Sequence, residues 1–74
     1  MAAVAVIGEE SLVRGYALAG AIVRPAEGRD AVRAAWSTLP ADVGLVLLTA
    51  AAARALDPVE RDDGPMTAVM TDDG

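Results

Sequence analysis

The sequence contains no cysteine, no histidine, no lysine and no phenylalanine among its 74 residues. Without cysteine, disulfides and thiolate metal sites are excluded. Without histidine, the most common zinc ligand and the most common general base are both missing, and so are Ser–His–Asp triads. We therefore predict that the chain is not an enzyme and that it holds no cofactor and no metal.

Positive charge is also scarce, because six arginines face eleven acidic residues and the formal net charge is −5. A nucleic-acid binder needs a concentrated basic surface, and so does a protein that adheres to anionic membranes. No stretch approaches the roughly 20 apolar residues that span a bilayer, and the apolar start lacks the basic region of a signal peptide. These absences predict a cytoplasmic protein with no nucleic-acid partner and no direct membrane insertion.

What the chain does have is small apolar residues. Hydrophobic residues make up 54% of it, with only one tryptophan and one tyrosine, and many of them are alanines that bury little area. A chain of this length forms one domain of modest stability. A partner that binds only the folded form would add stability by mass action. This composition favours a protein that works inside an assembly.

Apolar runs and amphipathic segments alternate along the chain. Strands are predicted at 3–7, 21–24, 43–48 and 66–70, and helices at 12–19, 28–39 and 50–59. Pro25 makes the second strand an edge strand, whereas the run 43–48 is the most apolar and predicts a central strand. Alternation of this kind is typical of stacked βαβ units. The fold class expected is α/β, a small open parallel four-stranded sheet in the flavodoxin-like order 2-1-3-4 with helices on both faces.

Local signals place the ends of the helices. In the first helix, Leu12, Tyr16 and Ala19 recur at helical spacing. Gly20 suits the left-handed residue that ends this helix, and Thr49 is a natural N-cap for the third. The whole chain, 1–74, is one domain, in which residues 62–65 form a turn and residues 71–74 a polar, disordered tail.

The carboxyl ends of parallel strands are where α/β proteins bind ligands, so the residues that follow these strands are candidates for a binding site. Glu9, Glu10 and Asp72 could converge on a divalent cation. The alternative, which we favour, is that Glu9 and Glu10 offset the dipole of the first helix and Asp72 is solvated. A receiver-type phosphoacceptor is excluded because the third strand ends in Leu48 and Thr49 and the chain has no lysine. A dinucleotide-binding fingerprint also fails, since the glycine spacing is wrong.

Five residues are candidates for an interface, namely Gly15, Tyr16, Trp36, Met66 and Val69. Gly15 is unusual inside a helix, and close packing of that helix on a strand is the favoured reason for it. Trp36 shares a helix face with Val32 and Leu39, which indicates core, although a half-exposed tryptophan could anchor a partner. Met66 and Val69 lie in a last strand whose open edge could pair with a second copy.

Two segments together resemble the F-subunit family of V-type (A/V-type) ATPases. The first runs Ala-Val-Ile-Gly-Glu-Glu from 5 to 10 and Arg-Gly-Tyr-Ala-Leu-Ala-Gly from 14 to 20. It is similar to the family's opening strand, its Gly–acid pair and its Gly-aromatic-x-Leu-Ala-Gly helix. The second segment, 42–49, is similar to the family's third strand, which closes on threonine. The family usually continues into a C-terminal helix that this sequence lacks.

The resemblance implies a non-catalytic central-stalk subunit. Such a subunit binds the coiled-coil rotor subunit, helps to couple ATP turnover to proton or sodium transport, and is peripheral to the membrane through the ATPase complex. The alternative is a stand-alone interaction module derived from that family, a homo-oligomer through its last strand with no part in ATPase coupling.

Overall fold

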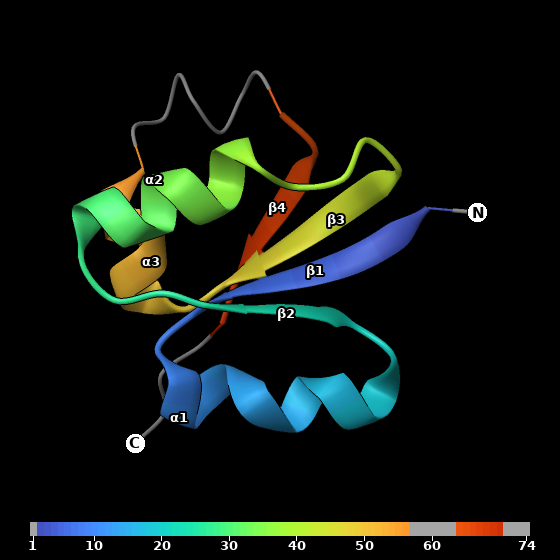
Figure 1. Cartoon of the computed structure of the whole chain (residues 1–74), viewed down its shortest axis with the longest axis horizontal. Coiled ribbons are helices and arrows are strands. Elements are labelled where there is room, and N and C mark those ends of the chain that lie inside the picture. The colour runs from blue at the N-terminus through green and yellow to red at the C-terminus, as the bar shows by residue number, and fades with distance from the viewer. Residues whose placement is uncertain (1, 57–63, 71–74) are drawn as a thin grey trace.

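The computed structural model describes residues 2–56 and 64–70. Within this part of the chain, four parallel strands form one sheet in the order β2-β1-β3-β4 (Figure 1). The elements are β1 (Ala3–Gly8), α1 (Glu10–Val13), the 3₁₀ helix η1 (Arg14–Ala19), β2 (Ile22–Pro25), α2 (Arg29–Ser37), β3 (Val43–Leu48), α3 (Ala50–Ala55) and β4 (Met66–Val69). The α/β class and the strand order expected from the sequence are confirmed.

The two inner strands are the most apolar runs of the chain. β1 lies between β2 and β3, and β3 lies between β1 and β4. The register pairs Ala5 with Val46 and Ile7 with Leu48. Strands buried on both faces need continuous apolar sequence, which is why 43–48 was expected at the centre. β2, which ends in Pro25, is at the edge as expected.

One face of the sheet carries the main core, under α2 and α3. Ile7 and Leu48 of the sheet are fully buried there, together with Val32 of α2, Ala52 of α3 and Leu56 just after α3. α2 follows the predicted periodicity, with Trp36 and Leu39 half-buried against this core. Small residues such as Ala52 let α3 approach the sheet closely.

The opposite face is partly covered by α1 and η1, and the residues that recur at helical spacing are not the buried ones here. Val13 is fully buried, whereas Leu12 is half exposed and Ala19 is exposed. The reason is that only Glu10–Val13 is α-helical and the chain continues as a 3₁₀ helix. A 3₁₀ helix has 3.0 residues per turn, so positions spaced for an α-helix do not stay on one side.

The ends of the helices follow local chemistry. Gly20 adopts φ 88° directly after η1, as expected for a left-handed C-terminal residue. Thr49 accepts a hydrogen bond from the Ala52 N–H at 3.2 Å, which confirms the predicted N-cap of α3. α3 ends at Ala55, earlier than expected, and Leu56 is extended but buried. Of the predicted turn at 62–65, residues 64 and 65 form a bend before β4, while residues 62 and 63, like Val59 and the tail 71–74, lie outside the described residues.

Membrane crossing was tested against the helices of the described ranges. None of them is long and apolar enough to traverse a bilayer.

Candidate functional site

A hydrogen bond between the ends of β1 and β3 occupies the carboxyl edge of the sheet. The hydroxyl of Thr49 donates to the Glu9 carboxylate at 2.6 Å, across forty positions of sequence. Thr49 is only 1% exposed, and its side chain lies against Gly8, where a Cβ would overlap it. β1 and β3 are the strands from which the chain departs in opposite directions, so this is the point where α/β sheets usually bind ligands.

Glu9 lies directly before α1, where the sequence places its charge, and its carboxylate has a second partner in Thr49. It precedes α1 but makes no side-chain capping bond to it, because its carboxylate turns to Thr49 instead. Glu10 does lie exposed in the first turn of α1, where a negative charge is favourable. Asp72 lies outside the described residues. Among the residues that the structure describes, no three acidic, histidine or cysteine side chains gather as a metal site would require.

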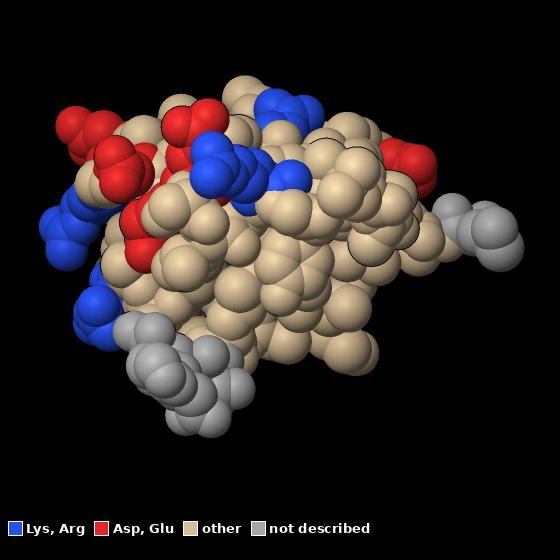
Figure 2. Space-filling view, turned by 90° about the horizontal axis from the view of Figure 1, so that it is seen from below, with Lys and Arg blue, Asp and Glu red and all other residues tan. Residues whose placement is uncertain are grey.

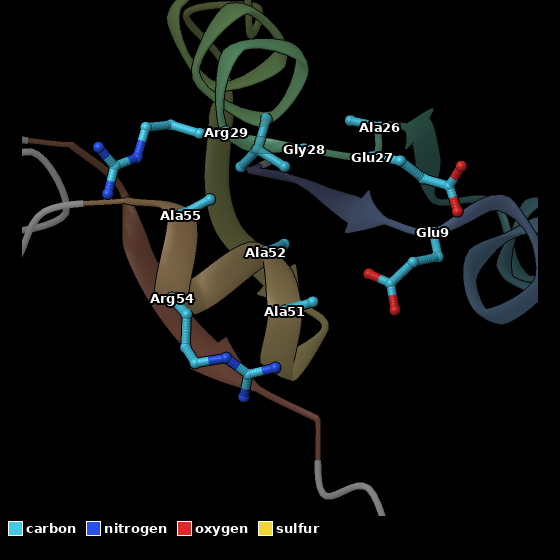
Figure 3. A pocket seen from close by; sticks show the side chains of 10 residues that line it. Glu9, Ala26, Glu27, Gly28, Arg29, Ala51, Ala52, Arg54 and Ala55 are labelled. Atoms are coloured by element: carbon cyan, nitrogen blue, oxygen red, sulfur yellow. The ribbon is translucent and has the colours of Figure 1, made fainter.

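Two hollows meet at Glu9 and Arg54. The first lies between the start of α2 and α3, and Figure 3 shows its side chains, with Glu9 and Glu27 on one side and Arg29 and Arg54 on the other. The second lies between α1, η1 and α3 and reaches Met70. Their walls mix acidic and basic groups over small alanines, and the hydrogen-bonded pair of Thr49 and Glu9 lines the second. Both hollows can form charged contacts.

The five predicted interface residues are divided between the two faces of the sheet. Tyr16 lies on the α1 side and Met66 on the same side of β4, since its pairing partner Leu45 alternates with Leu47, which shares a hollow with Tyr16. Val69 is three residues from Met66 along the strand and so lies on the opposite face. Trp36 is on the α2 side. The structure therefore places Tyr16 and Met66 on one side of the sheet and Val69 and Trp36 on the other.

Gly15 corrects one expectation. A Cβ built there meets no atom within 4 Å, so the helix does not pack closely on a strand at this position. The glycine lies exposed in η1 instead. No close contact within the described chain explains it.

Trp36 is neither wholly buried nor free. It is half-buried on the core side, and its indole covers Gly64, where a Cβ would overlap the ring. Gly64 comes just before β4. Trp36 thus packs against the segment that leads into the last strand, and a core role explains it without a partner.

The described elements cover only about half of the width of the sheet on its α1 side. α1 and η1 contact β1 and β2, and Val4, Leu47 and Tyr16 line a hollow of about 430 Å³ beside them. Figure 2 views this side and shows most of its charged side chains in the upper and left parts, with a large uncharged area in the middle and towards the lower right. We call the exposed and half-buried apolar residues of this side the open face: Val4, Leu12, Tyr16, Leu18, Leu45, Leu47, Met66 and Ala68.

Sequence reasoning missed most of the open face. Leu18 is 96% exposed and Leu12 is 50% exposed, although both lie in a segment expected to be an amphipathic helix. The number of helices could have indicated it. Among the described elements, one helical segment lies over this side of the four strands and two helices lie over the other side, so that part of the sheet stays uncovered by them.

No protein-family model, no curated protein and no solved structure matches this chain. The fold and the open face are therefore the observations on which a function has to be argued.

Proposed function

We propose that this chain is a non-catalytic interaction subunit, and specifically the central-stalk subunit of a V-type-like rotary ATPase. The observation that carries the proposal is the open face, a partly uncovered side of an all-parallel sheet with a large uncharged area. Parallel sheets are normally covered by helices on both faces. A helix of the coiled-coil rotor subunit is a suitable cover for the bare part.

Two further points support the proposal. The chain is an α/β domain with parallel strands in the order β2-β1-β3-β4, and an α/β domain is what the resemblance to the F-subunit family implies. Tyr16, in the segment that carries the resemblance, lines the hollow of the open face. In this role the chain would transmit rotation by packing, help to couple ATP turnover to proton or sodium transport, and act on the cytoplasmic side, held at the membrane through the complex.

The experiment is co-expression with the coiled-coil rotor subunit encoded in the same genome. We expect a 1:1 complex and a raised melting temperature, since a partner at 100 times its Kd adds about 2.7 kcal/mol of stability. Tyr16→Asp should abolish the complex, whereas Ala31→Asp on the exposed side of α2 should leave it intact. A chain that never binds the rotor subunit would overturn the proposal. So would the absence of ATPase genes beside its own.

The second candidate is a stand-alone module that forms a homo-oligomer through the edge of β4. The exposure of Met66 (73%) and Val69 (48%) on a four-residue edge strand favours it. Unpaired backbone groups at such an edge can pair with another strand. Thr67→Pro tests it, because the Met70 N–H donates to Leu48 and strand alternation then directs the Thr67 N–H outward, towards the edge.

A further inference from the structure

The open face has a raised half and a bare half. The raised half is the ridge formed by α1 and η1, which contacts β1 and β2. The bare half lies over β3 and β4, where Leu45 and Leu47 are only partly buried and Met66 is 73% exposed. No helix of the described chain makes more than slight contact with this half on the α1 side.

The two halves have nearly the same dimensions. Two strands spaced by about 4.8 Å give a strip about 10 Å wide, which is the diameter of one helix. A six-residue strand such as β3 is about 20 Å long. The ridge has four α-helical and six 3₁₀ residues, which amount to about 18 Å. The ridge therefore has the size that the bare half would accommodate.

We propose that the occupant of the bare half is the ridge of a second copy of this chain. A two-fold axis that runs along the strands, between two facing sheets, places each ridge over the other copy's β3 and β4. A two-fold axis that also lies midway between the two sheets but runs across the strands would place the two ridges on top of each other, so that they collide. The contact is isologous, because the same surface serves both copies. It brings Leu12 and Leu18 of one copy onto Leu47 and Met66 of the other.

The area is sufficient for a dimer. The Cα atoms span 30 × 26 × 19 Å, and the side seen in Figure 2 corresponds to the 30 × 19 Å outline, about 570 Å². Stable interfaces bury about 600–1,000 Å² per partner, and the accessible surface of a ridged face exceeds its outline. The ridge also explains why Leu18, 96% exposed in one copy, is a leucine.

The charge distribution agrees with this contact. Each copy carries a formal charge of −5, but the middle of the open face is uncharged. Repulsion between the copies is therefore long-range and screened by salt, while the apolar contact is not. Association should strengthen as salt rises from 0.05 to about 0.5 M, the opposite of an interface built on ion pairs.

The experiment is sedimentation equilibrium of the full chain, at two salt concentrations. We expect a species of twice the 7.5 kDa chain mass, and at least a tenfold weaker association for Leu18→Glu and Met66→Glu. Ala31→Glu on the exposed side of α2 is the matched control, because it adds the same charge elsewhere. Leu18 is so exposed that its substitution cannot unfold the single copy, and far-UV circular dichroism checks this.

Three outcomes would overturn the proposal. They are a monomer at millimolar concentration, a dimer that survives Leu18→Glu, and a dimer that Thr67→Pro abolishes while Leu18→Glu does not. The last result would instead assign the dimer to the β4 edge. These measurements need no rotor subunit, so they stand or fall apart from the central-stalk proposal. If both hold, the rotor subunit should displace the second copy, since the two share one face.

Discussion

The Thr49 hydroxyl and the Glu9 carboxylate form a 2.6 Å hydrogen bond that joins the carboxyl ends of β1 and β3. The same hydroxyl oxygen accepts the N–H of Ala52 at 3.2 Å and so begins α3. One buried side chain thereby links the first loop of the chain to its third helix. In many α/β proteins this position is left open for a ligand; here two of the protein's own side chains meet across it.

Thr49→Val should destabilise the fold by about 2 kcal/mol. The substitution removes the N-cap and leaves the half-buried Glu9 carboxylate without its donor, and each loss contributes about 1 kcal/mol or more. Thr49→Ser keeps the hydroxyl and should lose clearly less. Urea unfolding followed by circular dichroism measures both. The account of this bond is wrong if the valine variant unfolds at the midpoint of the parent chain.

Gly8 and Gly15 should respond to alanine in opposite ways. At Gly8 the added Cβ would overlap Thr49, so Gly8→Ala should cost about 1–3 kcal/mol through overpacking. At Gly15 the Cβ meets nothing within 4 Å, and Gly15→Ala should raise stability by about 0.5–1 kcal/mol because alanine favours helical backbone. Thermal unfolding of the two variants gives the comparison. Equal shifts in the same direction would contradict it.

The strand order could be predicted because it depends on patterns that the sequence carries locally. Four short apolar runs separated by helical segments, one of them ended by Pro25, restrict the topology to few choices. The first helix could not be predicted as well, because its departure from α-helical geometry after Val13 leaves no local signature.

The contacts that define the candidate site were beyond the reach of pattern reasoning for another reason. Glu9 and Thr49 are separated by forty residues, and each has a plausible local role as a cap. Thr49 fills that role as well, whereas Glu9 exchanges it for the long-range bond. Similarly, the open face exists because the described helices cover the two sides of the sheet unequally, and no single residue in the sequence indicates this.

Gly64→Ala should disturb the only tryptophan. The new Cβ would overlap the indole of Trp36, so the ring must turn away from the entry to β4. We expect the emission of Trp36 to shift to longer wavelength as water reaches the ring, with a loss of about 1–2 kcal/mol in stability. Because the chain has one tryptophan, its fluorescence reports this contact alone. Gly15→Ala is the control, and its emission should stay that of the parent chain.

Two prolines in β4 should separate the paired side of this strand from its open side. The Met70 N–H donates to the Leu48 carbonyl at 2.8 Å, so alternation directs the Ala68 N–H towards β3 and the Thr67 N–H away from it. Thr67→Pro removes a donor with no strand partner, as proline does in natural edge strands, and should cost at most about 1 kcal/mol. Ala68→Pro removes a ladder bond and should cost about 3 kcal/mol or more. Urea unfolding of both single variants decides the matter. The assignment of β4 as an edge fails if Thr67→Pro is the more damaging of the two, because a covered or paired outer side is then the simplest explanation.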